Sequence, residues 1–323
     1  MNGTLKRDLA IILGLAAVFA LVPQVLDNRY YITTLTLFFI WAIVVGQWNL
    51  VLGVAGIFSL GQMAIFAVGA YGTAMLGYYL EMPIWAAMLW AAGAAVLLSL
   101  LMGLACLRLQ GPYVALLTLA FVQIMSLAIV NDTACFTNPP SGCLPLFGGV
   151  RGFSRFGDLG FRELLGPGWY LGQYYVGLAL FIAALVFTVV ICRGPLGLAF
   201  VALRDQPGLA AARGISKLRY QLWVFGLSAF FTGMAGAFHA TQFGVVGPTV
   251  LSLTTLLFLL AMMIIGGVGT VWGPLMGVAL VMLADEAMQE FGDYRAIGLA
   301  ALMAGFVVLL PKGLSGLVRR ADR

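Results

Sequence analysis

The stretch RGPLGLAFVALRDQPGLAAARGISKLRY, from Arg193 to Tyr220, is a long polar interruption in an otherwise apolar chain. Two runs within it, Leu196–Asp205 and Gly208–Arg213, are rich in Ala and Leu, which favour helix. Because Pro207 breaks a helix and restricts the residue before it, we expect a short helix, a bend and a second short helix on a membrane surface. Such a loop either docks on a partner protein or only sets the topology, and its composition alone leaves both interpretations open.

The composition indicates an integral membrane protein. The chain has 323 residues, of which 62% are hydrophobic and 9% are charged, whereas soluble domains carry about 25% charged residues. The net charge of +5 indicates membrane orientation rather than nucleic-acid binding. We therefore expect an all-α, polytopic bundle embedded in membrane lipid, with residues 1–323 forming a single transmembrane domain.

About ten apolar segments are candidate membrane spans, since roughly twenty apolar residues cross a bilayer. We expect the first to be a retained helix rather than a signal peptide, because no A-x-A site closes it and Pro23 follows. Glycines break some of the other segments, and residues 252–287 fit either two short spans or a re-entrant pair. The ten segments are 9–23, 31–53, 57–79, 84–107, 112–130, 173–192, 220–240, 252–266, 271–287 and 294–311.

The basic residues assign the two sides of the membrane, because cytoplasmic loops carry an excess of Lys and Arg. If the N-terminus is cytoplasmic and ten spans follow, the inner segments hold twelve of the seventeen basic residues and the outer segments hold five. Both termini are then cytoplasmic, 193–220 is a cytoplasmic loop, 312–323 is a cytoplasmic tail and 131–172 is a periplasmic loop. The inner residues are Lys6, Arg7, Arg108, Arg193, Arg204, Arg213, Lys217, Arg219, Lys312, Arg319, Arg320 and Arg323; the outer ones are Arg29, Arg151, Arg155, Arg162 and Arg295.

The outer loop holds the pair Cys135 and Cys143. An oxidising outer compartment favours a disulfide between them, and the alternative is two free thiols in a loose loop. Cys106 and Cys192 fall at inner helix ends and are expected to be packing residues. No cysteine spacing in the chain is typical of a zinc site, so we expect no bound metal.

Enzyme chemistry has few candidate residues. The one histidine, His239, lies in an apolar run and is more typical of a hydrogen-bonded structural residue than of a catalyst. None of the three lysines is followed by Ser or Thr, so the chain contains no Walker A motif. We expect no catalytic residue and no ATP site in this chain.

Two glycine-rich stretches interrupt the apolar segments, Asn49–Ala70 and Ile264–Gly277. Broken helices at membrane depth are tolerated where they are buried or line a cavity, and in transporters they often mark the substrate path. The alternative is close helix packing through small residues. The candidate path or gate residues are Asn49, Gly53, Gly56, Ser59, Gly61, Gln62, Gly266, Gly267, Gly269 and Gly273.

The chain resembles the LivM-type permease subunit of ABC importers for branched-chain amino acids. Four stretches carry the resemblance: WNLVLGVAGIFSLGQMAIFAVGAYGTAML (Trp48–Leu76), GPYVALLTLAFVQI (Gly111–Ile124), Arg193–Phe238, and IIGGVGTVWGPLMGVAL (Ile264–Leu280). They extend from the second expected span to the ninth and are specific in combination. The outer loop and the first helix do not contribute to the resemblance.

The resemblance implies that the inner loop carries coupling helices that sit in a cleft of the ATPase subunits. The family often has Glu in this loop, where this chain has Asp205, Gln206 and alanines. Docking is therefore expected to depend on apolar contacts and on Arg204 and Arg213. The coupling role is carried to Arg204, Asp205, Ala210, Ala211, Ala212, Gly214 and Ile215.

The resemblance also implies the partners and the mechanism. The partners are a homologous LivH-type permease, two LivG/LivF-type ATPase subunits that bind ATP and Mg²⁺, and a periplasmic substrate-binding protein. The chain itself is then a multi-pass protein of the bacterial inner membrane. The mechanism is ATP-driven alternating access. Permeases of this kind serve urea, short amides and other small solutes as well as Leu, Ile and Val, and nothing in this chain separates those substrates.

Two other function classes compete with the importer. A stand-alone carrier or channel for a small neutral or zwitterionic solute would transport without partners. A membrane-embedded enzyme would need clustered polar residues at one membrane face, where the sequence offers the scattered outer arginines Arg151, Arg155 and Arg162. The importer is preferred because of the resemblance.

Overall fold

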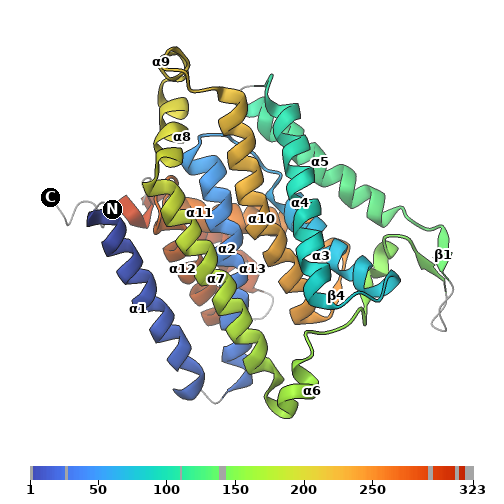
Figure 1. The fold of residues 1–323 in the computed structure, drawn as a ribbon. Helices are drawn as coiled ribbons and strands as arrows, with labels where there is room; N and C mark the ends of the chain where they lie inside the picture. Colours follow the sequence, from blue (N-terminus) through green and yellow to red (C-terminus); the bar gives the residue numbers. More distant parts are fainter. Residues whose placement is uncertain are drawn as a thin grey trace.

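The fold is described from a computed structural model covering residues 3–25, 28–109, 111–137, 143–289, 294–309 and 313–316. Figure 1 shows a bundle of helices. The described residues also contain four very short strands. This architecture confirms the expected all-α class. The helices are α1 (Gly3–Val25), α2 (Arg29–Asn49), the π-helical turn η1 (Leu50–Val54), α3 (Gln62–Tyr79), α4 (Ile84–Cys106), α5 (Pro112–Val130), α6 (Phe161–Leu165), α7 (Trp169–Arg193), α8 (Pro195–Asp205), α9 (Pro207–Ala212), α10 (Lys217–Phe243), α11 (Leu253–Gly266), α12 (Gly273–Ala287) and α13 (Arg295–Leu309), with 3-10 turns at Gly149–Arg151, Gly166–Gly168 and Pro248–Leu251.

The strands form two small antiparallel pairs in the loops. β1 (Cys135–Thr137) pairs with β2 (Leu144–Pro145) inside the expected outer loop. β3 (Phe153–Ser154) pairs with β4 (Val245–Val246), which follows α10. The second pair therefore attaches the outer loop to the end of α10.

Six helical segments in the described part of the chain are long and apolar enough to cross a membrane. Each of the ten expected segments contains a helix, but α3, α11, α12 and α13 are not among these six. Length and composition alone therefore do not fix the number of crossings. The six are Gly3–Val25, Arg29–Val54, Ile84–Cys106, Pro112–Val130, Phe161–Arg193 and Lys217–Phe243.

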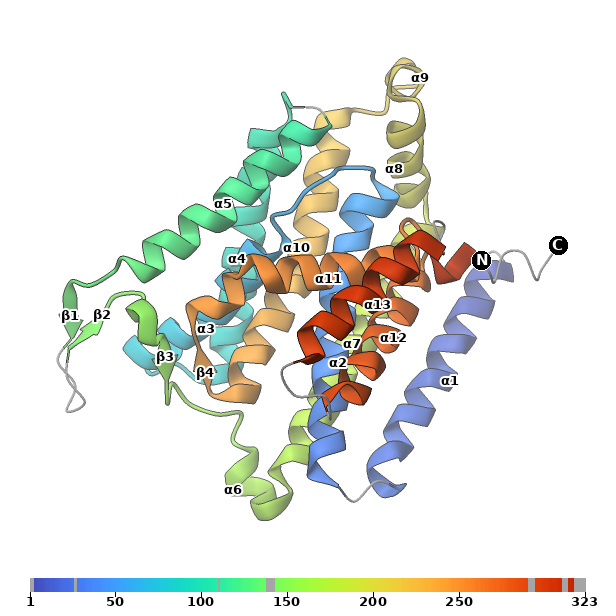
Figure 2. The ribbon, with the colours of Figure 1, turned by 180° about the vertical axis from the view of Figure 1, so that it is seen from behind.

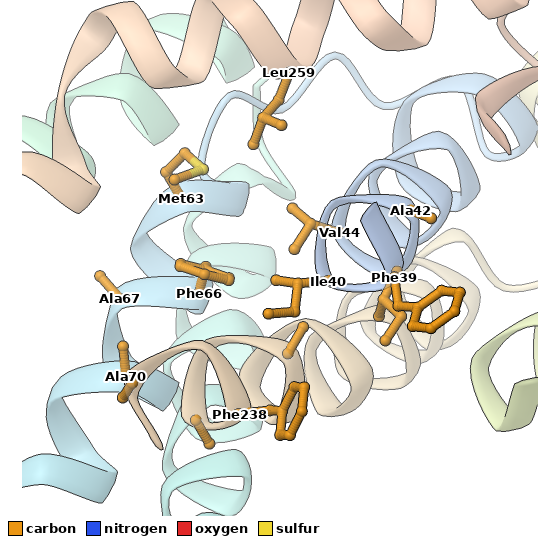
Figure 3. Packing of buried hydrophobic residues seen from close by; sticks show 14 of the residues in the cluster. Phe39, Ile40, Ala42, Val44, Met63, Phe66, Ala67, Ala70, Phe238 and Leu259 are labelled. Carbon is orange, nitrogen blue, oxygen red and sulfur yellow. The ribbon is translucent and has the colours of Figure 1, made fainter. Parts of the chain in front are cut away.

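Small residues bring α3, α4 and α10 together at the centre of the bundle. A Cβ atom on Gly69 of α3 would lie 2.0 Å from the carbonyl oxygen of Gly233 on α10. A Cβ atom on Gly236 would lie 2.0 Å from the carbonyl oxygen of Phe66. The backbones are thus in direct contact, as is common where membrane helices pack through small residues. Figure 3 shows the apolar side chains beside this crossing, among them Phe39, Ile40 and Val44 of α2, Met63 and Phe66 of α3, Phe238 of α10 and Leu259 of α11.

Polar contacts at opposite ends of the bundle fix the relative directions of the helices. At one end, the carboxylate of Asp8 in α1 pairs with Arg193 (2.8 Å to Nε) and accepts a hydrogen bond from Trp272 (3.3 Å to Nε1). At the other end, the hydroxyl of Tyr30 donates to Glu286 (3.0 Å) and contacts Gln289 (2.9 Å). The start of α1, the end of α7 and the start of α12 therefore lie at the same end as α8 and α9, as the charge distribution requires.

Residues 252–287 form a helical hairpin. Figure 2 shows α11 lying across the upright helices, with α12 returning beside it. The two helices touch through glycine, since a Cβ atom on Gly277 would lie 1.9 Å from the carbonyl oxygen of Met262. α11 has 14 residues and is about 21 Å long. It is shorter than the roughly 30 Å hydrocarbon core of a bilayer.

Candidate functional site

The first glycine-rich stretch interrupts the helical structure between α2 and α3, inside the bundle. α2 continues into the π-helical turn η1, and the backbone then turns at Gly56, whose φ is +71°. Side chains satisfy the non-helical backbone that follows: Trp48 Nε1 donates to Ser59 O (2.7 Å), and Leu60 N donates to Thr118 Oγ1 (2.9 Å). This stretch is the broken helix that the sequence predicted, and several of its backbone groups are bonded within the protein.

α3 begins in the interior, with polar partners at its first residues. Gln62 is 3% exposed, and its side-chain amide donates to Thr232 Oγ1 on α10. Gly61 precedes it, and a Cβ atom there would lie 2.0 Å from Met102 Cε. The N-terminal end of α3 therefore points into the protein rather than into water.

The second glycine-rich stretch forms the turn of the α11–α12 hairpin. Gly267 and Gly269 have φ values of +110° and +78°. Thr270 Oγ1 donates to Gly267 O (2.9 Å) and accepts from Gly273 N (3.1 Å), so it caps the start of α12. A Cβ atom on Gly266 would lie 2.0 Å from Gly273 O, which leaves no room for a side chain.

The two glycine-rich stretches meet at Asn49, which is 1% exposed. Its Oδ1 accepts a hydrogen bond from Gly269 N (2.7 Å), and its Nδ2 donates to Thr270 O (2.8 Å). A Cβ atom on Gly53, one turn further along, would lie 2.4 Å from Gly269 N. The break after α2 and the turn before α12 are thus one contiguous structure, although about 220 residues separate them.

The polar loop that opens at Arg193 forms the two expected short helices, α8 and α9, with the bend at Gln206. Ile215 N donates to Ala210 O and Gly214 N donates to Ala211 O, each across 3.0 Å. Gly214 has a φ of +81°, so this is a Schellman-type end for α9. Figures 1 and 2 show α9 at the tip of the molecule, beyond the ends of the long helices.

The outward face of α9 is small and apolar. Leu209 is 54% exposed, and Ala211, Ala212 and Arg213 are also exposed, whereas Ala210 is buried. A hollow of about 300 Å³ lies between α8 and α9, lined by Asp205, Gln206 and Leu209 among others.

Arg204 at the end of α8 faces inward, onto the broken helix. Its Nη1 donates to Gly53 O (2.7 Å), and its Nε donates to Asp205 Oδ1 (2.8 Å). Its aliphatic part covers Gly56, where a Cβ atom would lie 2.2 Å from Arg204 Cγ. The hydrogen bond from Arg204 holds the pKa of the Asp205 carboxyl below its usual value.

Two hollows flank this junction. One, of about 430 Å³, lies between the residues after η1, the start of α10 and α8, with Gly56, Arg204, Lys217 and Gln221 in its lining. The other, of about 310 Å³, lies on the side of the hairpin turn and is lined by Arg7, Arg193 and Thr270 among others.

The structure therefore brings most of the sequence-predicted site residues into one region. Asn49 and Gly53 contact Gly269, and Arg204 contacts both Gly53 and Gly56. Gly266, Gly267 and Gly273 complete the hairpin. Ser59, Gly61 and Gln62 continue from it into the bundle. Lys312 and residues 317–323 of the expected cytoplasmic tail lie outside the described residues.

Sequence reasoning missed three side chains that hold this region: Trp48, Thr118 and Thr270. Each is a single hydrogen-bonding residue in or beside an apolar run. The sequence does not show which distant residue it bonds to, so nothing marked it as part of the site. His239, the one histidine, is enclosed by the rings of Trp41, Phe66 and Phe243, with centroid distances of 5.7, 5.4 and 4.7 Å. These rings pack the imidazole from three elements of the chain.

The loop expected on the outer side carries a disulfide between Cys135 and Cys143, whose Cα atoms lie 5.4 Å apart. Each cysteine lies at the β1–β2 pair, and Asp132 Oδ2 accepts from Phe147 N (2.5 Å) to hold the loop base. Residues 138–142 between the two cysteines lie outside the described residues. Cys106 is a buried free cysteine and Cys192 is a partly buried one.

Comparison with known proteins gives a consistent result over nearly the whole chain. A family model described as "Branched-chain amino acid transport system / permease component" matches residues 30–311. The chain is 30% identical to the high-affinity branched-chain amino acid transport system permease protein LivM of Escherichia coli, over 98% of this chain and 77% of that protein. It is equally similar to the protein of the same description from Salmonella typhimurium, with the same identity and coverage. No solved structure matches the chain significantly.

Proposed function

The chain belongs to the permease-component family of branched-chain amino acid transport systems, and we propose that it forms half of the membrane path of an ATP-driven importer in a bacterial inner membrane. The other half is a homologous LivH-type permease. Two LivG/LivF-type ATPase subunits bind ATP and Mg²⁺ on the cytoplasmic face, and a periplasmic binding protein delivers the solute. Branched-chain amino acids are the favoured substrates, because the curated relatives are described as transporting them.

In this proposal the chain crosses the membrane ten times with both termini in the cytoplasm. Asp8, Arg193 and Trp272 share one end of the bundle with α8 and α9, and that end is the cytoplasmic one. Gly313 also lies there, since a Cβ atom on it would be 2.6 Å from Gly267 N. The basic residues of the inner segments support the same orientation.

α9 and its surroundings dock into the ATPase subunits. The projecting position of α9, its Schellman-type end and its exposed Leu209, Ala211 and Arg213 support this assignment. Arg204 is already engaged within the chain, so the contact with the ATPase falls to the apolar face and to Arg213.

The broken stretches line or gate the path. The lining is uncharged around Ser59, Gly61 and Gln62, and the N-terminal end of α3 supplies a fixed dipole there. A zwitterionic amino acid needs such dipoles rather than fixed charges, and broken helices supply them in transporters. In alternating access, the conformational change would then occur at these two helix breaks.

The observation that carries the proposal is the contact between the projecting α8–α9 loop and the buried break, through Arg204 and Gly53. It connects the surface proposed to dock on the ATPase with the broken helix proposed to gate the path. The test is a gentle detergent pull-down of the tagged chain expressed with its neighbouring genes, followed by mass spectrometry and transport in liposomes. Co-purification of a Walker-type ATPase and a second permease, with ATP-dependent uptake, is the expected result.

The second candidate is a stand-alone carrier for a small neutral or zwitterionic solute. It is favoured if the chain is isolated alone and transports in liposomes without ATP. Within the importer, urea or short amides are the alternative substrates, and uptake assays with the purified binding protein separate them from Leu, Ile and Val.

A further inference from the structure

The hydrogen bonds at the junction form a chain that runs from the surface loop to both broken helices. Arg204 of α8 donates to Gly53 O in η1 across 2.7 Å. Asn49, four residues before Gly53, holds Gly269 N and Thr270 O in the hairpin turn. We propose that Arg204 and Asn49 are the positioning residues that transmit movement of α8–α9 to η1 and from there to the α11–α12 hairpin. This inference rests on the proposed coupling function of the loop.

The first step of the linkage depends on how η1 ends. The carbonyls at the end of a helix lack partners within the helix. The backbone leaves the helix at Gly56, and the Ala55 and Ile57 amides donate back to Leu50 O and Val51 O. The guanidinium of Arg204 therefore caps η1 from another element, with a charge-assisted hydrogen bond. If α8 moves away alone, the carbonyl of Gly53 loses its hydrogen-bond donor. A movement in which η1 follows α8 keeps this bond and therefore costs less free energy.

The second step depends on the amide of Asn49. Both of its polar atoms bond to the backbone of the hairpin turn, and the residue is 1% exposed. The turn cannot slide past η1 either, because Gly53 and Gly269 approach too closely to admit a Cβ atom on Gly53. A displacement of η1 therefore either carries the turn with it or breaks two partly buried hydrogen bonds, which is unfavourable.

The two steps give α8, η1 and the hairpin turn one shared displacement. Coupling here means that moving one of these elements alone costs more free energy than moving all three together. Its physical basis is the three hydrogen bonds and the one backbone contact described above. The linkage also explains why Arg204 faces inward, although a docking residue would be expected to face the partner.

The test follows the hairpin turn directly, without relying on uptake. The reporter is a Val268→Cys variant, since Val268 lies in the turn and is 42% exposed, made in a background where Cys106 and Cys192 are replaced by Ala. The complex with its ATPases is purified, and the maleimide labelling rate at this position is compared with and without vanadate trapping of ATP. The linkage predicts a trapping-dependent change in the labelling rate.

Arg204→Ala and Asn49→Ala, each added to the reporter, should lower that change by about tenfold, because each removes at least one partly buried hydrogen bond of the linkage. Arg204→Lys, which keeps a cationic donor, should retain part of it. Because the two steps act in series, the double variant should lose no more than either single variant. Arg219→Ala, an exposed arginine at the start of α10 outside the linkage, is the matched control and should keep the full change.

The outcomes separate this inference from the proposed function. If no ATPase co-purifies, the importer proposal fails, and the linkage fails with it. If the ATPase is present and trapping changes the labelling equally in the parent, Arg204→Ala and Asn49→Ala proteins, the importer proposal stands and the linkage is wrong. Additive losses in the double variant would also overturn it, since they indicate two independent routes.

Discussion

Arg204 Nη1 donates a hydrogen bond of 2.7 Å to the carbonyl oxygen of Gly53, across 151 positions of the sequence. The loop that holds Arg204 is polar and surface-exposed, and the turn that holds Gly53 is buried. This contact joins the exposed α8–α9 loop to the buried break after α2. It also changes the expectation that Arg204 serves only to pair with a partner, because two of its five N–H donors bond inside the chain, to Gly53 O and Asp205 Oδ1.

Replacing Arg204 and Asp205 together by Ala should uncouple ATP hydrolysis from uptake. The substitution removes the cap on η1 and the side chain that covers Gly56. Co-purification of the ATPases should persist, because the apolar face of α9 is unchanged. The measurement is leucine uptake per ATP hydrolysed in liposomes, and unchanged substrate-stimulated uptake would show that the contact is not part of coupling.

Asp205 should not govern the pH dependence of uptake near neutrality. The hydrogen bond from Arg204 lowers its pKa below the usual 3.8. The interaction that lowers this carboxyl pKa contributes fully to stability at pH values above the usual pKa. The contribution is lost only as the pH falls through the lowered pKa. From about pH 5 to about pH 8 the carboxylate stays ionised. The normalised pH profiles of the parent and of Asp205→Asn should therefore coincide in that range; a step present only in the parent would contradict this.

Alanine at Gly53 or Gly56 should reduce uptake by about tenfold or more, while assembly remains. At Gly56 a side chain faces a φ of +71°, which costs about 1–2 kcal/mol, and meets Arg204 Cγ; at Gly53 it meets the backbone of Gly269. Gly61→Ala should be milder, because its nearest neighbour is Cε, the far end of the flexible Met102 side chain, and not backbone. Gly46→Ala is the control, since nothing lies within 4 Å of a Cβ atom there. Uptake equal to the control in both the Gly53 and Gly56 variants would remove these glycines from the path.

The sequence predicted the elements of this site more reliably than their contacts. The α8–bend–α9 arrangement follows from Pro195, Pro207 and Gly214, whose backbone preferences are local. The ten helical segments follow from hydropathy in the same way. The glycine-rich stretches marked where helices break, because glycine adopts the positive φ that Gly56 and Gly269 require.

The contacts between these elements depend on three-dimensional approach, which no local pattern encodes. Asn49 was a candidate path residue, yet its bonds to Gly269 and Thr270 cross about 220 positions. Thr118 lies in an apolar helix, where a single hydroxyl usually bonds to its own helix, and here it also accepts from Leu60 N. Hydropathy also left the crossings of α11 and α12 open, because both helices are short.

Asp8→Asn should lower the stability of the purified protein by about 2–3 kcal/mol, because removing one partner of a buried ion pair leaves the other uncompensated. Asp8 is 1% exposed and bonds to both Arg193 and Trp272, so it fastens α1 to α7 and α12. The side chain of Arg193 is 35% exposed. The expected loss of stability is therefore smaller than the roughly 3–5 kcal/mol for a fully buried ion pair. Thermal unfolding in detergent measures the effect.

The control for this prediction is Asp158→Asn. Asp158 pairs with Arg162 at 3.7 Å, and both side chains are largely exposed. Exposed pairs contribute about 0–1 kcal/mol, so this variant should unfold close to the parent temperature. Equal shifts for the two variants would contradict a structural role for Asp8.

Replacing Cys135 and Cys143 together by Ser should loosen the outer loop without disturbing the membrane core. The disulfide closes a short loop of sequence separation 8, and cross-linking a loop of this size stabilises by about 2.5 kcal/mol in the chain-entropy account. The rest of the loop is held separately, by the β3–β4 pair and by Asp132. Limited proteolysis from the outer side should therefore become faster between residues 131 and 148, while co-purification of the partners is retained. Treating the parent with a reductant should reproduce the double variant. Maleimide labelling of both cysteines in the unreduced parent would show that the bond does not form in the cell, and proteolysis would then be unchanged by the substitutions.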